Sequence, residues 1–424
     1  MLKQHPKGLY YLFVIEIWER FGFSILSAVQ VLYMDKVLKF DDSTKGILYG
    51  AFLGASYLFP LLGGFVGDRV LGQTRTVASG VLSMALGYAG LALSGPDRVY
   101  LFYAGLALVA FGTGIFKVNM STLLGNVYRH APALKDAGFN IYYMGVNIGF
   151  TLGPIVATAV GLYWNDYRIT FWIACGGMVL ALLFIGLGQR VLGQANILFR
   201  ASDHHADSET ALAPHEFRDR IVTLVGLFLI AAFFWIPFYQ NGMALTLFAE
   251  RSTRAYRFLR PETYQVFNAI FIVLLTPPML ALFARLRRTG REPSTPVKIF
   301  MGMIVMALAM GLMAVGGLAG GNQDEKIMSP LWLIMTYLLI TLAEIMFSPM
   351  GMSYVSKVAP PRVQGLMMGG WFCATALGAL SAGIFGRFYR SMDHHLYFLM
   401  LSGISVLAGG LVLGILKRLK KYAE

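Results

Sequence analysis

The sequence predicts an all-α integral membrane protein, with 12 transmembrane helices in two six-helix bundles. The first observation is composition: 57% of the 424 residues are hydrophobic and only 13% are charged, whereas a soluble domain has about a quarter of its residues charged. The second is that the apolar residues come in blocks of about twenty, the length of helix that crosses a ~30 Å hydrocarbon layer. Helices are expected because lipid cannot hydrogen-bond an open backbone.

The third observation is the order of these blocks along the chain. The expected spans are 10–34, 45–66, 76–95, 99–121, 138–162, 169–191, 219–248, 263–284, 297–318, 329–356, 363–386 and 395–416. The longest polar stretch follows the sixth span. We therefore predict an N-terminal six-helix bundle over 1–191, a cytoplasmic linker over 192–218 and a C-terminal six-helix bundle over 219–424. This layout is typical of the major facilitator superfamily, whose site lies at the midplane between two halves.

The basic residues predict the orientation of the chain. An even number of spans puts both termini on one side, and that side carries about 21 of the Lys and Arg residues, against about 12 on the other. Both termini are therefore expected in the cytoplasm, in a multi-pass protein of the plasma (cell inner) membrane. The net charge of +13 then reflects orientation signals in short loops, and it does not indicate a nucleic-acid surface. No cleavable signal peptide is apparent at the N-terminus.

Cysteine and histidine give little sign of a metal site. Cys175 and Cys373 both lie in apolar segments, where a buried small hydrophobic role is expected instead of a disulfide or metal ligand. His204, His205 and His215 lie in or near the linker, which is interpreted as a solvated segment, with a metal site as the alternative.

Five charged residues lie well inside expected spans: Glu16, Glu19, Arg20, Lys117 and Glu344. A charge at that depth is costly unless it is paired or hydrated, so these residues are functional candidates, with a purely structural ion pair as the alternative. The spacing of Glu16, Glu19 and Arg20 puts them on one helix face. Three acids against two bases leave one carboxylate without its own cation, and such a group tends to bind a proton in a low dielectric. A proton-coupled carrier needs a site of this kind.

The segment from Glu16 to Phe21 reads EIWERF, and it resembles the ExxERF signature of the proton-coupled oligopeptide transporter (POT/PTR) family of the major facilitator superfamily. Four further segments resemble the family in the same order: GGFVGDRVLGQTRT (63–76), GIFKVNMSTLLG (114–125), DAGFNIYYMGVNIG (136–149) and AEIMFSPMGMSYVSKVAPPRVQGLMMGGWF (343–372). The resemblance covers nearly the whole chain. It implies a twelve-helix alternating-access fold with a peptide cavity at the midplane.

The resemblance also assigns roles by position. It places proton coupling at Glu16, Glu19 and Arg20, with Lys117 as their partner, and it places Glu344 at the amino end of the peptide. The residues expected to line the cavity are Tyr57, Tyr143, Asn147, Trp235, Asn268, Ser348 and Trp371. For each aromatic residue, core packing is the alternative. A carrier of many peptides should grip the ammonium, the carboxylate and the amides, and leave room for side chains.

Two positions depart from the family pattern. Many members carry an Arg where this chain has Ser27, and a Glu where it has Tyr239. In the family, that Arg and that Glu are thought to form an outer gate pair, so a neutral, packed gate is expected here. Tyr239 is alternatively a ring that contacts substrate. The chain is also short for a bacterial member, because 192–218 leaves no room for the two additional helices that many of those have.

Together these features predict a symporter that imports di- and tripeptides with protons, without a resident cofactor. Its expected partners are small peptides, protons and membrane lipid, not nucleic acid. The alternative is a carrier or exporter of another small amphoteric or peptide-like molecule in the same fold. A receptor or scaffold would not need a titratable cluster. An enzyme is not expected, because we find no nucleophile–base pairing or metal-ligand spacing.

Overall fold

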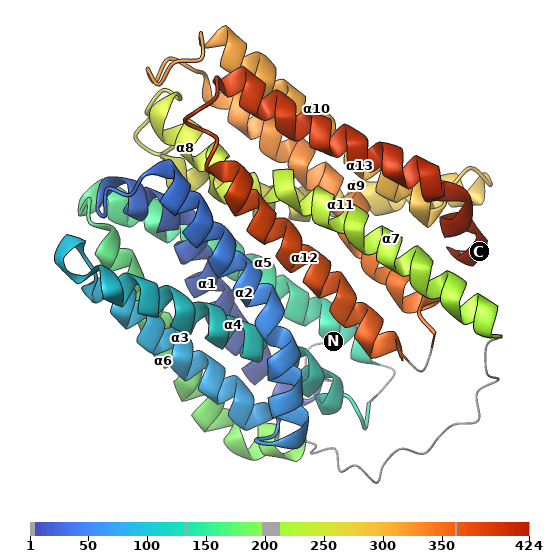
Figure 1. The fold of residues 1–424 in the computed structure, drawn as a ribbon. Helices are drawn as coiled ribbons and strands as arrows, with labels where there is room; N and C mark the ends of the chain where they lie inside the picture. Colours follow the sequence, from blue (N-terminus) through green and yellow to red (C-terminus); the bar gives the residue numbers. More distant parts are fainter. Residues whose placement is uncertain (1–4, 132–133, 197–212, 361–362, 424) are drawn as a thin grey trace. The chain divides into compact units, whose positions relative to one another are not determined.

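The computed structural model describes residues 5–131, 134–196, 213–360 and 363–423, and it is built from α-helices (Figure 1). The first six helices are α1 (Lys7–Lys36), α2 (Asp42–Arg69), α3 (Gln73–Leu93), α4 (Val99–Val127), α5 (Lys135–Tyr163) and α6 (Tyr167–Gln194). The others are α7 (Pro214–Phe238), α8 (Ala244–Arg251), α9 (Gln265–Arg288), α10 (Thr295–Ala319), α11 (Pro330–Val358), α12 (Gln364–Gly386) and α13 (His394–Ala423). Short 3₁₀ turns η2 (Pro96–Arg98), η4 (Tyr239–Gly242) and η5 (Pro261–Tyr264) precede or follow some of them.

Every expected span coincides with helix, so the predicted all-α membrane fold is confirmed. Within the described ranges, 11 helical segments are long and apolar enough to cross a membrane. The first helix, α1, is not among them, because Glu16, Glu19 and Arg20 lower the hydropathy of its middle. Its 30 residues nevertheless reach roughly 45 Å, which exceeds the hydrocarbon thickness.

The expected seventh span, 219–248, lies within the segment Pro214–Arg251, which is long and apolar enough to cross a membrane. The helix breaks at η4, so that α7 and α8 are separate elements. Pro237 near the end of α7 cannot donate the usual intrahelical hydrogen bond, and Asn241 and Gly242 form a turn sequence. The break therefore has a local cause in the chain.

Contacts between residues divide the chain into two compact units. Unit 1 comprises Met1–Lys39 and Ala55–Asp207, and unit 2 comprises Phe40–Gly54 and Ser208–Glu424. The start of α2 thus belongs to unit 2 and the remainder to unit 1. The domain boundaries at 191 and 218 stay a prediction. Of the expected linker, residues 197–212, with His204 and His205, lie outside the described residues.

Glycines set the closest helix contacts in unit 1. Gly149 and Gly153 of α5 face α1 so closely that a Cβ on Gly149 would lie 2.6 Å from the Cβ of Arg20, and one on Gly153 would lie 1.9 Å from the Ser24 hydroxyl. Small residues allow membrane helices to approach in this way. The charged face of α1 is consequently pressed against α5.

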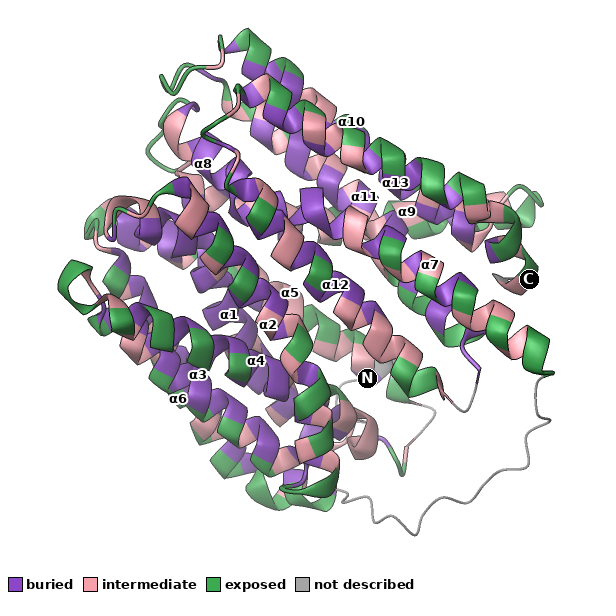
Figure 2. Ribbon diagram, viewed as in Figure 1, coloured by how far each residue is buried: buried purple, intermediate pink, exposed green. Residues whose placement is uncertain are grey.

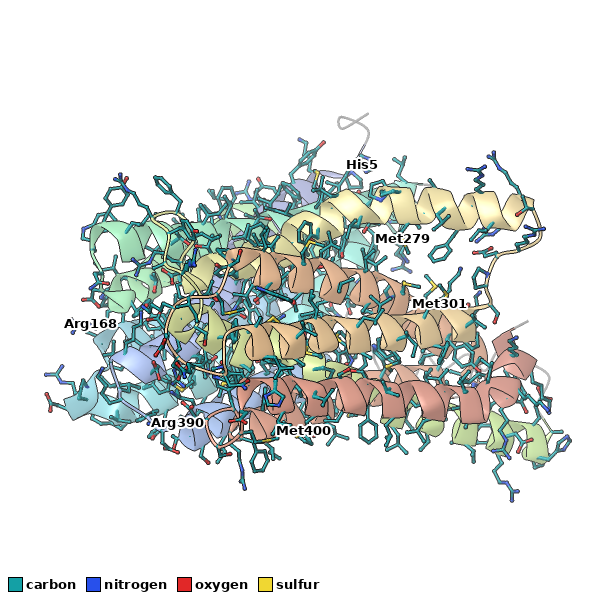
Figure 3. The ribbon with its side chains drawn as sticks, turned by 90° about the horizontal axis from the view of Figure 1, so that it is seen from above. His5, Arg168, Met279, Met301, Arg390 and Met400 are labelled. Atoms are coloured by element: carbon teal, nitrogen blue, oxygen red, sulfur yellow. The ribbon has the colours of Figure 1, made fainter. Side chains whose placement is uncertain are left out.

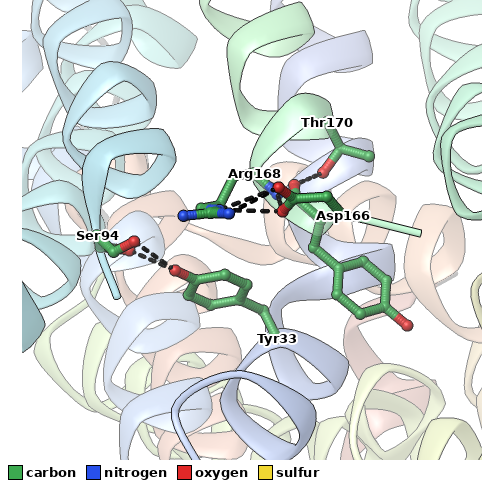
Figure 4. Close-up of polar contacts among 6 residues, drawn as sticks. Tyr33, Ser94, Asp166, Arg168 and Thr170 are labelled. Atoms are coloured by element: carbon green, nitrogen blue, oxygen red, sulfur yellow. Dashed lines mark hydrogen bonds and ion pairs between the residues drawn. The ribbon is translucent and has the colours of Figure 1, made fainter. Parts of the chain in front are cut away.

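Unit 1 is also closed by polar contacts at one end of its helices (Figure 4). The Tyr33 hydroxyl of α1 donates to the Ser94 carbonyl at 3.0 Å and lies 2.8 Å from the Ser94 hydroxyl, just after α3. Asp166 caps α6 by accepting from the Arg168 backbone N–H at 2.9 Å, and it pairs with the Arg168 guanidinium at 2.9 Å. These contacts fix the ends of α1, α3 and α6.

Both units have apolar outer faces. Figure 2 shows buried residues on the helix faces that meet other helices and exposed residues on the outer faces. Many of the exposed residues are large and apolar: Leu187 of α6 is 72% exposed, Leu331 of α11 is 64% exposed, and Met301 of α10 (labelled in Figure 3) is 39% exposed. Such extensive apolar surface suits contact with lipid, not with water.

Candidate functional site

Three charged side chains of α1 form a buried cluster in unit 1. The Nε of Arg20 lies 3.1 Å from an oxygen of Glu16 and 2.5 Å from an oxygen of Glu19. The Arg20, Glu16 and Glu19 side chains are 6%, 4% and 0% exposed. The structure thus brings these three predicted residues together, and one guanidinium serves two carboxylates.

Tyr142 of α5 completes this cluster, and it was not among the predicted site residues. Its hydroxyl donates a hydrogen bond to the second oxygen of Glu16. The sequence carried a signal for it, because Tyr142 shares one face of α5 with Gly145, Gly149 and Gly153 at spacings of three, seven and eleven residues. That glycine face is the one that packs on α1.

The neighbouring residues Tyr143 and Asn147, which were predicted to line the cavity, follow Tyr142 on α5. Tyr143 is 55% exposed. Asn147 is half-buried, and its side-chain amide donates to the Tyr143 carbonyl at 2.9 Å. Both residues belong to α5 in unit 1, and their role in substrate binding stays a prediction.

Lys117 of α4 lies beside the cluster without joining it. Its Nζ stands 4.6 Å from the ring centroid of Tyr57 on α2, a cation–π contact. Lys117 has no ion-pair partner among the described residues, although it is close enough to Glu19 for the two charges to interact. The predicted partnership between Lys117 and the cluster is therefore electrostatic in this structure, and Tyr57 holds the ammonium.

In unit 2, Glu344 of α11 is a half-buried carboxylate without a cation among the described residues. It accepts a hydrogen bond from the Asn268 amide of α9 at 3.0 Å, and the same amide lies 3.1 Å from the Thr341 hydroxyl. Glu344 and Asn268, two of the predicted site residues, are therefore in direct contact. Ser348, one turn further along α11, is half-buried.

The predicted aromatic residues of unit 2 are packed together. Trp235 stacks on Tyr239 with centroids 5.4 Å apart, and Phe347 stacks on Trp371 with centroids 5.6 Å apart. Trp235 also meets Phe347 edge-on at 6.2 Å. Trp235, Tyr239 and Trp371 are 6%, 6% and 2% exposed. This burial favours the packing alternative for Trp371, while its role toward substrate stays a prediction.

The helices have apolar outer faces that suit lipid, and they carry titratable side chains inside the membrane spans. These two features define the class of protein as a multi-pass membrane transport protein. The sequence profile of the POT family matches residues 74–198 and 205–399. The chain belongs to the POT family, as its motifs predicted.

Curated relatives agree with this family over most of their length. The uncharacterized transporter YclF of Bacillus subtilis (strain 168) is 29% identical, over 96% of this chain and 93% of its own. The peptide transporter YePEPT of Yersinia enterocolitica subsp. palearctica is 30% identical, over 90% and 88%. The dipeptide and tripeptide permease A of Serratia proteamaculans (strain 568) is 29% identical, over 90% and 83%.

Solved structures match the fold throughout. The crystal structure of peptide transporter POT in complex with sulfate superimposes with a TM-score of 0.88, at 26% identity, over 99% of this chain and 96% of that one. A mutant of peptide transporter POT in complex with alafosfalin gives a TM-score of 0.89, at the same identity and coverage. The transporter fold predicted from the sequence is thereby confirmed.

Proposed function

We propose that this chain is a symporter that imports di- and tripeptides by alternating access, driven by protons. Membership of the POT family supports the transport class, and relatives that carry the names peptide transporter and dipeptide and tripeptide permease support the substrate class. The single observation that carries the proposal is Glu344, a carboxylate within a spanning helix that an amide holds and no cation of the described chain neutralises.

Glu344 suits the amino end of a peptide. An ammonium placed against it would gain an ion pair and could also donate to the Asn268 carbonyl oxygen, because that amide's other end already bonds to the carboxylate. The side chains of a peptide would then remain without specific partners, as a broad carrier requires.

The α1 cluster suits the proton. Glu16 and Glu19 share Arg20, so one negative charge remains to be balanced within a buried site. A proton or the ammonium of Lys117 can provide that balance, and a site that exchanges these two partners couples a proton to a movement of charge. The proton is then the coupling ion, and no resident cofactor or chemical reaction is part of the proposal.

The location follows from the same charges. We place the protein in the plasma (cell inner) membrane with both termini in the cytoplasm, because the basic loops lie on the side of the termini. Lipid is then the partner of the outer apolar faces, and peptides and protons are the transported partners. The protein has no proposed role on nucleic acid.

Uptake by purified protein in proteoliposomes tests the proposal. An inward proton gradient should drive accumulation of a labelled dipeptide above its external concentration, and a protonophore should abolish the accumulation. Unlabelled di- and tripeptides should compete, and single amino acids should not. Gradient-driven uptake that peptides do not inhibit would instead favour a carrier of another small amphoteric molecule.

A further inference from the structure

The two carboxylates of the α1 cluster have different surroundings. One oxygen of Glu16 lies 3.1 Å from the Nε of Arg20, and the other accepts a hydrogen bond from the Tyr142 hydroxyl. Glu19 lies 2.5 Å from the Nε of Arg20, and Lys117 is near enough to act on its charge, but neither of its oxygens receives a well-directed hydrogen bond from the described residues. Glu19 is also the more deeply buried of the two, with a side chain that is 0% exposed.

This difference decides where a proton binds. A hydrogen bond donated to a carboxylate stabilises its charged form, whereas burial without donors favours its neutral form. When two acids share one cation, the first proton goes to the acid whose charge is less stabilised, and the two sites titrate as a coupled pair. The Tyr142 hydroxyl is the contact that makes Glu16 and Glu19 unequal.

We infer that Tyr142 is a positioning residue that holds Glu16 as the constant anionic partner of Arg20 and so directs the coupling proton to Glu19. This inference rests on the proposed function, because it concerns the route of the coupling proton. The proton would form an O–H bond with Glu19 on entry and leave that oxygen on release, while Glu16 keeps its charge throughout. Tyr142 itself keeps its proton and donates it as a hydrogen bond.

The remaining groups around the two carboxylates are compatible with this assignment. The charged or titratable side chains that act on the α1 cluster come from four other helices. Tyr57 on α2 and Tyr142 on α5 act on Arg20, and Tyr88 on α3 and Lys117 on α4 act on Glu19. From α6, apolar Met178 lies against α1 at Gly22. None of these side chains is a carboxylate, so the coupling proton is assigned between Glu16 and Glu19.

The test replaces Tyr142 by Phe, which keeps the ring and removes only the hydroxyl. A matched control is Tyr163→Phe on the same helix, where the side chain is 74% exposed. Dipeptide uptake in proteoliposomes is measured against external pH. Without its donor Glu16 competes for the proton, so the midpoint of the pH profile should move upward by about one pH unit in Tyr142→Phe. The control should superimpose on the wild type. A Tyr142→Phe profile that superimposes as well would overturn the inference.

Infrared difference spectroscopy gives a second readout that does not depend on transport or on the folding of Tyr142→Phe. Acidification of the wild-type protein should produce a buried protonated-carboxyl band, and Glu19→Gln should remove that band. If the band survives Glu19→Gln and disappears in Glu16→Gln, the proton binds Glu16 and the inference is wrong. If the wild type shows the Glu19 band but accumulates no dipeptide, the proposed function fails and the proton assignment stands.

Discussion

At the scale of single residues, the first prediction concerns Lys117, which lies beside the α1 cluster and over the ring of Tyr57. Lys117→Ala should abolish gradient-driven accumulation of dipeptide. In the variant, no ammonium can balance the charge of the buried carboxylates after the proton leaves, so proton release is no longer linked to transport. Exchange of labelled for unlabelled peptide, which needs no net proton movement, should persist. Both rates are measured in proteoliposomes, and thermal unfolding of the purified variant checks that it folds.

A matched control for this substitution is Lys298→Ala. Lys298 also has its Nζ over an aromatic ring, 4.2 Å from the centroid of Phe283, but it pairs with Glu292 at 2.6 Å. It has no place in the proposed coupling site. Lys298→Ala should therefore still accumulate dipeptide. If Lys117→Ala accumulates dipeptide as well, the proposed coupling role of Lys117 is wrong.

Glu344 predicts a difference between ligands. If Glu344 receives the ammonium of the substrate, Glu344→Gln should weaken binding of free dipeptides and leave N-acetylated dipeptides nearly unchanged. Removing one partner of a desolvated pair costs roughly 3–5 kcal/mol, or about a hundredfold to several thousandfold in affinity. Competition binding with both ligand types measures the difference. Equal losses for both would remove Glu344 from this role.

Sequence reasoning found the charged residues of the site because a charge inside an apolar span stands out without a structure. It missed Tyr142, because a tyrosine in a membrane helix is common and its importance lies in where its hydroxyl points. That direction depends on the close packing of Gly149 and Gly153 against α1. The contact of Lys117 with Tyr57 was likewise beyond the sequence, since the two residues come from different helices.

At the scale of elements, the break after α7 sets the surroundings of Tyr239. Its ring stacks on Trp235, and its carbonyl accepts a hydrogen bond from the Tyr49 hydroxyl at 3.0 Å. We expect Tyr239→Phe to retain most transport, because the ring packing is kept. Tyr239→Ala should lose it, because the cavity left at the end of α7 costs about 3 kcal/mol or more.

Accessibility labelling of single cysteines on the outer side of α1 and α7 separates the two interpretations of Tyr239. A gate that no longer packs shut should raise the outward-open population in Tyr239→Ala. An unchanged population combined with lost peptide binding would assign the ring to the substrate pocket. The native Cys175 and Cys373 are first replaced by Ala for this measurement.

The loop between α9 and α10 predicts a pH-dependent contribution to stability. Glu292 accepts hydrogen bonds from Arg287 and from Lys298, and these lower the pKa of Glu292 to about 2 from an ordinary value of 4.5. A lowered folded-state pKa contributes stability above pH 4.5 that is lost as the pH falls toward 2. Glu292→Gln should therefore reduce stability by a constant amount between pH 5 and 8, about 1 kcal/mol after solvent screening.

Thermal unfolding of the wild type and Glu292→Gln over a pH series checks this prediction. The difference in Tm should disappear at acid pH, where Glu292 of the wild type takes up its proton. A difference that varies between pH 5 and 8 would contradict it, because no proton binds Glu292 in that range.

At the scale of the whole molecule, the sequence predicted the order of the apolar spans, since hydropathy reports each span on its own. It did not predict that α2 is divided between the two units. That division follows from three-dimensional packing: a Cβ on Gly46 of α2 would lie 2.4 Å from the Gly383 carbonyl oxygen of α12. This contact requires small residues on two segments that are far apart in the sequence. The pattern of residues within one segment does not indicate which other segment it packs against.

The start of α2 is held in unit 2 by Asp42, which accepts two hydrogen bonds from Arg251 of α8, both at 3.0 Å, and also pairs with Lys45. The predicted orientation puts this end of α2 on the outside. Because the rest of α2 belongs to unit 1, we expect these contacts to part when the carrier opens outward if α2 moves as one helix. On that expectation, they favour the outward-closed state.

The arrangement predicts unequal effects of removing its members. Arg251→Ala leaves Asp42 paired with Lys45, so it should favour the outward-open state by only about 1 kcal/mol. Asp42→Asn removes the carboxylate that Arg251 and Lys45 share, and it should favour that state by roughly 3 kcal/mol. Labelling of an introduced cysteine at the outer end of α1 reports the outward-open population in each variant. A larger effect of Arg251→Ala than of Asp42→Asn would mean that Asp42 is not the anion on which closure depends.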